Sequence, residues 1–161
     1  VRCSQLNLTQ LPIEVGSLTA GCSSSPGLLV VGGQGAETSV ELWSPETSCI
    51  LPSLPRAMAG VTLDILQGLP VACHSTACFH LNATGWHTYQ LTLVSRIYHT
   101  SAVLEDDLLL VGGSKSPSTT EVLPGDGGEA IMGFSLNPGR MEHCSIQVRL
   151  TNRHPYLFPS L

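Results

Sequence analysis

The sequence predicts an all-β fold, and three observations support that prediction. Only 12% of the 161 residues are charged, while 16 glycines and 11 prolines favour short strands and tight turns over long surface helices. No segment sustains the i, i+3, i+4, i+7 spacing of an amphipathic helix. The chain also repeats itself, because LLVVGG at residues 28–33 returns 80 residues later as LLLVGG at 108–113.

Each glycine pair belongs to a predicted β-hairpin. The apolar run before the glycines suits a strand buried on both faces, and polar residues follow as a loop. A second strand comes next, SVELW at 39–43 or TTEVL at 119–123, with Glu41 and Glu121 at the centres. We therefore expect strand, loop, strand in both copies, with the twin glycines at positive φ.

A third copy is expected midway, near residue 73. There VACHSTACFHL at 71–81 has an apolar approach, Cys73-His74 in place of the glycines, and another strand-like run. Arginines and histidines repeat at spacings of 40 and 44 residues: Arg56, Arg96 with His99, and Arg140 with His143. The pattern indicates about three units of roughly 40 residues, each with four short segments.

Together these motifs resemble the kelch repeat, in which each blade of a β-propeller is a four-stranded sheet. The resemblance covers 28–148, in the order LLVVGG, SVELW, LPSLPR, RIYHTS, LLLVGG, TTEVL and RMEHC. It implies about three four-stranded blades, with 1–27 packing on or completing a blade and 149–161 as a C-terminal segment. It also implies structural roles for the glycines at the strand ends, for arginines that donate to several carbonyls, and for the two tryptophans. These residues are Gly32, Gly33, Gly112, Gly113, Arg56, Arg96, Arg140, Trp43 and Trp86. Of the tryptophans, Trp86 is expected to pack between blades.

Three blades cannot close a ring, because propellers usually close with about 4–8 blades. We therefore expect another copy of the chain, or another protein chain, to complete the propeller and cover its open blade faces. Part of a larger, cleaved protein is a further explanation. A β-trefoil, which is a closed monomer of three similar units, is the alternative fold.

Six cysteines and two glycosylation sequons favour a secreted, glycosylated chain. On the propeller interpretation Cys73 and Cys78 flank a turn between two strands, which suits a disulfide. The pairing of the remaining cysteines stays open, with Cys3–Cys22 and Cys49–Cys144 as one choice and bonds to a partner chain as another. The sequons begin at Asn7 and Asn82. The alternative is a cytosolic protein with free buried thiols.

Composition and motifs argue against several function classes. A net charge of −5 without a basic run disfavours nucleic acid or an anionic membrane as partner. No apolar run reaches the ~18–20 residues needed to span a bilayer. The Cys and His residues within 73–80 have spacings unlike those of common zinc modules. One kelch relative, the galactose-oxidase type, is a copper radical oxidase, but the tyrosines here lie in no recognisable ligand cluster: Tyr89, Tyr98 and Tyr156. We therefore expect no catalytic residues, no metal and no cofactor.

By resemblance, the function is binding or assembly in a non-enzymatic extracellular module. The loops after the inner strands are the expected binding surface, because such loops are presented rigidly. They contain Gln34, Gly35, Glu37, His74, Ser75, Thr76, Ser114, Lys115 and Ser116. The alternatives are a structural subunit of a larger secreted complex, a small-ligand or glycan-binding protein, and an enzyme of the copper-oxidase kind.

Overall fold

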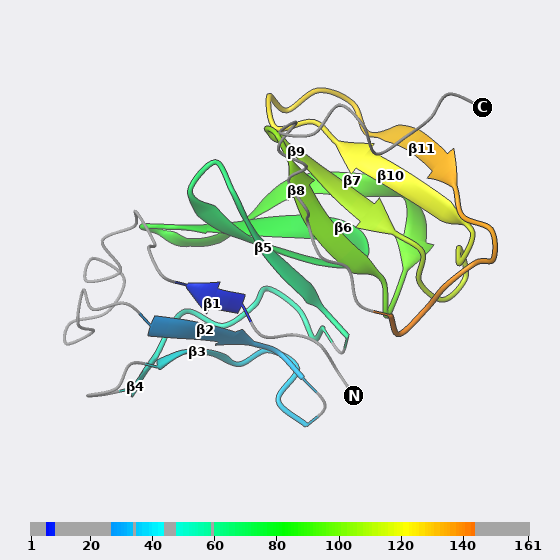
Figure 1. The fold of residues 1–161 in the computed structure, drawn as a ribbon. Helices are drawn as coiled ribbons and strands as arrows, with labels where there is room; N and C mark the ends of the chain where they lie inside the picture. Colours follow the sequence, from blue (N-terminus) through cyan, green and yellow to red (C-terminus); the bar gives the residue numbers. More distant parts are fainter. Residues whose placement is uncertain (1–5, 9–26, 34, 44–47, 59, 144–161) are drawn as a thin grey trace, which may run out of the picture.

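The structure, a computed structural model, describes residues 6–8, 27–33, 35–43, 48–58 and 60–143. Within these residues the fold is all-β, as predicted: eleven strands form three antiparallel sheets, and there is no helix. The described part of the chain accordingly contains no helix able to cross a membrane. Figure 1 shows the sheets in chain order, from the blue and cyan first sheet through the green second sheet to the third, which runs from yellow-green β8 and β9 to yellow β10 and orange β11.

The first and third sheets have the same topology, with strands paired in their order along the chain. The first sheet contains β1 (Leu6–Leu8), β2 (Gly27–Val31), β3 (Val40–Trp43) and β4 (Ser48–Ile50). The third contains β8 (Thr100–Leu104), β9 (Asp107–Val111), β10 (Thr119–Leu123) and β11 (Ile131–Ser135). Leu28 pairs with Trp43 and Leu108 with Leu123, so both predicted hairpins are present in the same register.

The twin glycines end the second strand of each of these sheets. Gly32 and Gly112 have φ of 60° and 63°, and Gly33 and Gly113 have φ of 120° and 99°. Residues with a β-carbon rarely adopt these angles, which explains why glycine is used twice. A β-carbon on Gly112 would also collide with the Arg140 carbonyl, so the third sheet requires glycine for space as well.

The second sheet departs from the predicted four-stranded unit. Its strands are β5 (Thr62–Leu66), β6 (Leu69–Asn82) and β7 (Gly85–Arg96). The turn expected between Cys73 and Cys78 is not a break between strands, because both lie in β6. Residues up to Cys73 pair with β5, whereas Ser75 onward pairs with β7, with an irregularity between Ser75 and Ala77. The chain changes partner there because Ser75 adopts positive φ, 55°.

Two hydrophobic cores fill the spaces between sheets. One joins the first sheet to the second, with Leu29, Val40 and Leu42 packed in the same cluster as Phe79 and Leu81. The other joins the second sheet to the third and contains Leu66, Val71, Cys73, Cys78, Leu108, Leu110 and Leu123. Each sheet therefore packs against the next, and the described sheets do not close into a ring.

One packing prediction was wrong for the first copy. Residues 108–110 are buried on both faces of β9, as expected for a continuous apolar run. In β2, however, Leu29 is buried while Val30 is 41% exposed. Successive side chains of a strand point to opposite faces, and Val30 lies on the face of the first sheet that is turned away from the second.

Candidate functional site

A buried ion pair joins the second sheet to the third. Arg96 ends β7 and Glu121 lies mid-β10; Nε and Oε2 are 3.3 Å apart, and both side chains are 0% exposed. Arg96 Nη1 also donates to the Gly112 and Thr119 carbonyls, each at 2.9 Å. Burial lowers the pKa of Arg96, while the bond to Glu121 opposes that shift. One planar guanidinium thus donates to the carbonyl after β9, to the carbonyl at the start of β10 and to a carboxylate, and so joins the two sheets.

Three linkers, one after each sheet, share a backbone feature. Gly60, Tyr98 and Glu142 each adopt positive φ, at 74°, 58° and 52°. The residues two positions earlier are Met58, Arg96 and Arg140. The backbones also correspond, because a β-carbon on Gly32 would contact the Met58 carbonyl and one on Gly112 would contact the Arg140 carbonyl. The three linkers are therefore repeats in space.

This alignment corrects the expected equivalence of Arg56 with Arg96. Met58, not Arg56, stands where Arg96 stands, and its side chain is fully buried in the first core. Arg56 is exposed, donates to the His74 carbonyl at 3.1 Å, and holds its guanidinium 5.3 Å from the Phe79 ring centre. The sequence did not reveal Met58, because the 40-residue spacing of the arginines pointed to Arg56.

The two histidines bind the start of the preceding sheet. His99 Nε2 lies 3.2 Å from Thr62 Oγ1, and His143 Nε2 lies 3.0 Å from Thr100 Oγ1. Burial, together with the charges of nearby Arg96 and two other histidines, lowers the pKa of His99 to about 3. Burial also lowers the pKa of His143. These side chains are therefore neutral near pH 7 and act as fixed hydrogen-bonding groups.

Arg140 has the backbone of its counterpart Arg96 but not the side-chain contacts. Its N–H donates to the Pro117 carbonyl at 2.7 Å, and its own carbonyl accepts from Gly113 N at 2.8 Å. Its side chain is exposed and forms no hydrogen bond or ion pair with the residues that the structure describes.

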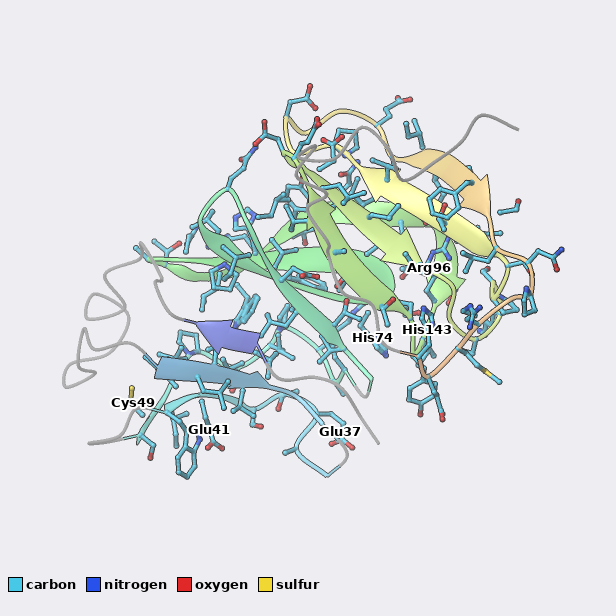
Figure 2. The ribbon with its side chains drawn as sticks, viewed as in Figure 1. Glu37, Glu41, Cys49, His74, Arg96 and His143 are labelled. Carbon is cyan, nitrogen blue, oxygen red and sulfur yellow. A yellow bond between two sulfur atoms is a disulfide. The ribbon has the colours of Figure 1, made fainter. Side chains whose placement is uncertain are left out.

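The predicted binding residues lie on three separate segments. Gly35 and Glu37 occupy the turn between β2 and β3, where Gly35 N donates to Glu37 Oε1 at 2.9 Å and holds the pKa of Glu37 below its usual value. Gln34 lies outside the described residues. Figure 2 shows Glu37 and His74 on different segments.

The other two segments differ in accessibility. His74 and Ser75 are half-buried within β6, and Thr76 is exposed, so this group is part of a strand and not a loop as expected. Between β9 and β10, Lys115 is exposed, while Ser114 and Ser116 are half-buried and hydrogen-bonded through their backbones.

The predicted disulfide between Cys73 and Cys78 is present. The Cα atoms are 4.1 Å apart and both residues are buried in the second core. An extended strand would separate residues five apart by about 16 Å, so β6 folds back on itself here. Cys49 is also disulfide-bonded. Cys144, the partner considered for it, lies outside the described residues, as do Cys3 and Cys22.

The second sequon lies at a hairpin tip. Asn82 is half-buried at the turn between β6 and β7, and its Oδ1 accepts from the N–H and Oγ1 of Thr84, at 2.9 and 2.8 Å. Asn7 lies in β1, and its side chain is outside the described part. Trp86 packs against the core between the first and second sheets and donates to the Pro52 carbonyl at 2.9 Å.

Asp64, a largely buried carboxylate in β5, is not among the residues expected from the sequence. Ser101 Oγ in β8 donates to Asp64 Oδ2, and burial raises the pKa of Asp64 to about 6. The residue gave no signal because a single aspartate in a strand reveals neither its partner nor its burial.

The described residues do not fit a copper site of the oxidase kind. No group of three or more His, Cys, Asp or Glu side chains among them is placed to hold a metal ion. The Tyr89 hydroxyl donates to the Pro124 carbonyl at 2.6 Å and Tyr98 is exposed, whereas Tyr156 lies outside the described part.

Comparison with known proteins supports the fold alone. No protein-family model and no curated protein matches the chain. Among solved structures, the chain is similar to a fungal alcohol oxidase of the AA5 family in complex with copper, with a TM-score of 0.54 and 14% identity. The match covers 81% of this chain and 32% of that one, so the chain spans about a third of its length. A similar arrangement of sheets therefore forms part of that larger oxidase.

Proposed function

We propose that the chain is a non-enzymatic extracellular binding and assembly module, formed by three blades of a kelch-like propeller. Its twin-glycine hairpins repeat with the same register, and Arg96 clamps one sheet onto the next. The kelch resemblance includes copper oxidases of the galactose-oxidase type, and the similar solved structure is a copper alcohol oxidase. Both observations support a propeller segment, and neither assigns the activity of the oxidase to this chain.

One observation carries the assembly function. The side of the first sheet turned away from the second exposes a row of apolar residues: Val30 at 41%, Trp43 at 50% and Ile50 at 75%. Apolar patches on rigid β-sheets mark interaction surfaces, because leaving them in water costs free energy. Another copy or another chain that completes the propeller would cover this side.

Disulfide chemistry and the sequon support an extracellular location. The described cysteines are all disulfide-bonded, and disulfides persist in oxidising compartments. Chain produced in a secretory host should lose mass on enzymatic removal of N-glycans, and Asn82→Gln should lower the glycosylated mass. Equal masses for the Asn82→Gln variant and the original chain, both before removal of glycans, would contradict glycosylation at Asn82.

The exposed row is tested by making it polar. The triple variant Val30→Ser, Trp43→Ser, Ile50→Thr is compared with the original chain by chemical crosslinking in the medium of secreting cells. The original chain should form a defined adduct heavier than its 17.0 kDa, and the variant should not. A matched control is Leu91→Ser, which removes an exposed apolar residue on β7 instead. A monomer in every sample would contradict the assembly function.

The copper oxidase likeness favours one second candidate, an enzyme. Elemental analysis of chain refolded with Cu²⁺ separates the two, since an oxidase of the copper kind requires a stoichiometric bound copper. Retention of about one copper per chain after dialysis, with alcohol oxidation, would favour the enzyme over the binding module.

A further inference from the structure

The first and third sheets place equivalent residues in opposite environments. On the third sheet, Leu110 and Leu123 face the second sheet and are 0% exposed. Their counterparts 80 residues earlier, Val30 and Trp43, occupy the open side of the first sheet. The third sheet therefore shows what covers this side when a preceding sheet is present.

Glu41 has the position of Glu121 without its arginine. Glu121 lies opposite Leu110 in the β9–β10 ladder, and Glu41 lies opposite Val30 in the β2–β3 ladder. Yet Glu41 Oε2 accepts only from Trp43 Nε1, at 2.9 Å, and forms no ion pair with any residue that the structure describes. The carbonyls that correspond to those bound by Arg96 are those of Gly32 and Ser39. A complete anion and acceptor site for a guanidinium is thus present at the start of the described fold.

Arg140 supplies the missing half at the other end. It follows the third sheet as Arg96 follows the second, with a positive-φ residue two positions on and a histidine bonded to the preceding sheet. Its guanidinium is exposed, and no later sheet lies within the described residues to receive it. One end of the three-sheet stack therefore has an arginine without its carboxylate, and the other end has a carboxylate without its arginine.

We propose that two copies of this chain pair head to tail, with Arg140 of each copy bound to Glu41 and the Gly32 and Ser39 carbonyls of the other. The third sheet of one copy then covers the exposed Val30 and Trp43 of the other. This pairing rests on the proposed function as an assembly module. Two copies give six sheets, within the range of about 4–8 in which propellers close, and a twofold axis makes both junctions identical.

Reversing one charge tests the pairing. The chain is expressed whole, N-glycans are removed, and its mass in solution is measured by sedimentation as a function of concentration. The original chain should sediment as a pair of 17.0-kDa chains. Glu41→Arg places Arg against Arg at both junctions, and Arg140→Glu places Glu against Glu. Each variant should weaken the pair at least about 30-fold, since losing a desolvated charge partner costs that much or more.

Mixing the two variants gives the decisive outcome. A pair containing one Glu41→Arg chain and one Arg140→Glu chain has opposite charges at both junctions, so the mixture should pair again. The double variant should also pair with itself, and this recovery shows that both substituted chains fold. Glu129→Arg, at an exposed residue between β10 and β11, is the charge control and should pair like the original.

Other outcomes separate the pairing from the function on which it rests. A monomeric original chain, or a pair that survives each single reversal, would overturn the pairing. If the chain is monomeric alone but crosslinks to a different protein through the exposed row, the assembly function stands and the second copy is excluded as its occupant. If neither pairing nor crosslinking occurs, both proposals fail.

Discussion

Arg96 and Glu121 form an ion pair that is entirely buried between two sheets, with Nε and Oε2 3.3 Å apart. The pair lies 25 residues apart in sequence and connects the end of the second sheet to the middle of the third. Because the guanidinium also donates to two carbonyls, its loss would remove one donor from each of three acceptors: the Glu121 carboxylate and the Gly112 and Thr119 carbonyls. The first prediction concerns this cluster.

Glu121→Gln and Arg96→Met should each lower the free energy of unfolding by about 3–5 kcal/mol, the cost of leaving a buried charge without its partner. The double variant should lose less than the sum of the two, because neither charge is then left alone. Urea unfolding followed by circular dichroism measures this at one fixed protein concentration, since association would shift apparent stability. Glu129→Gln is the exposed control. Additive losses would show that the two charges do not stabilise each other.

Removing the Cys73–Cys78 disulfide should cost about 2 kcal/mol. The bridge closes a loop between residues five apart, and so short a loop removes little entropy from the unfolded chain. The variant Cys73→Ala, Cys78→Ala is preferable to reduction, because Cys49 is also disulfide-bonded. Urea unfolding provides the value, with exposed Thr76→Ala as the control inside the same loop. An unchanged unfolding midpoint would contradict a stabilising role.

Asp64→Asn should stabilise the chain more at about pH 7.5 than at about pH 3.5. Folding raises the pKa of Asp64 from 3.8 to about 6, so between these values the native state binds more protons than the unfolded state. The carboxylate therefore costs stability progressively as the pH rises through this window. Thermal unfolding at several pH values measures the difference, and Asn preserves an acceptor for Ser101. A gain that is equal at both pH values would disprove this titration.

His99 should have the opposite effect on acid stability. Burial lowers its pKa from 6.5 to about 3, so the unfolded state binds more protons in this range and stability falls as the pH is lowered through it. His99→Gln should make the chain's stability less sensitive to pH between about 6.5 and 3, whatever it does at pH 7. The comparison is cleanest on an Asp64→Asn background, which removes the opposing titration. A slope identical to that of the background chain would contradict a buried, neutral His99.

The local elements of the fold could be predicted because short-range chemistry determines them. Alternation, apolar runs and glycines identified both hairpins, and an 80-residue repeat placed them in register. The Cys73–Cys78 bridge was also predictable, since two cysteines five apart near a turn can reach one another. The kelch propeller, the partner and the binding loops remain predictions.

The candidate site was less predictable, because its groups come together only when sheets pack. Spacing alone selected Arg56, but linker geometry placed Met58 at the position of Arg96. Asp64 gave no signal in the sequence and acquired its raised pKa from burial next to Ser101.

The sequence by itself determined that the chain forms repeated antiparallel hairpins, since strand periodicity and positive-φ glycines depend on neighbouring residues only. Only the tertiary structure decided that Glu121 is sealed against Arg96 while Glu41, its equivalent, lies on an uncovered side. Burial depends on which sheet packs against each face, and that contact joins residues far apart in the chain. Two nearly identical motifs therefore have different roles.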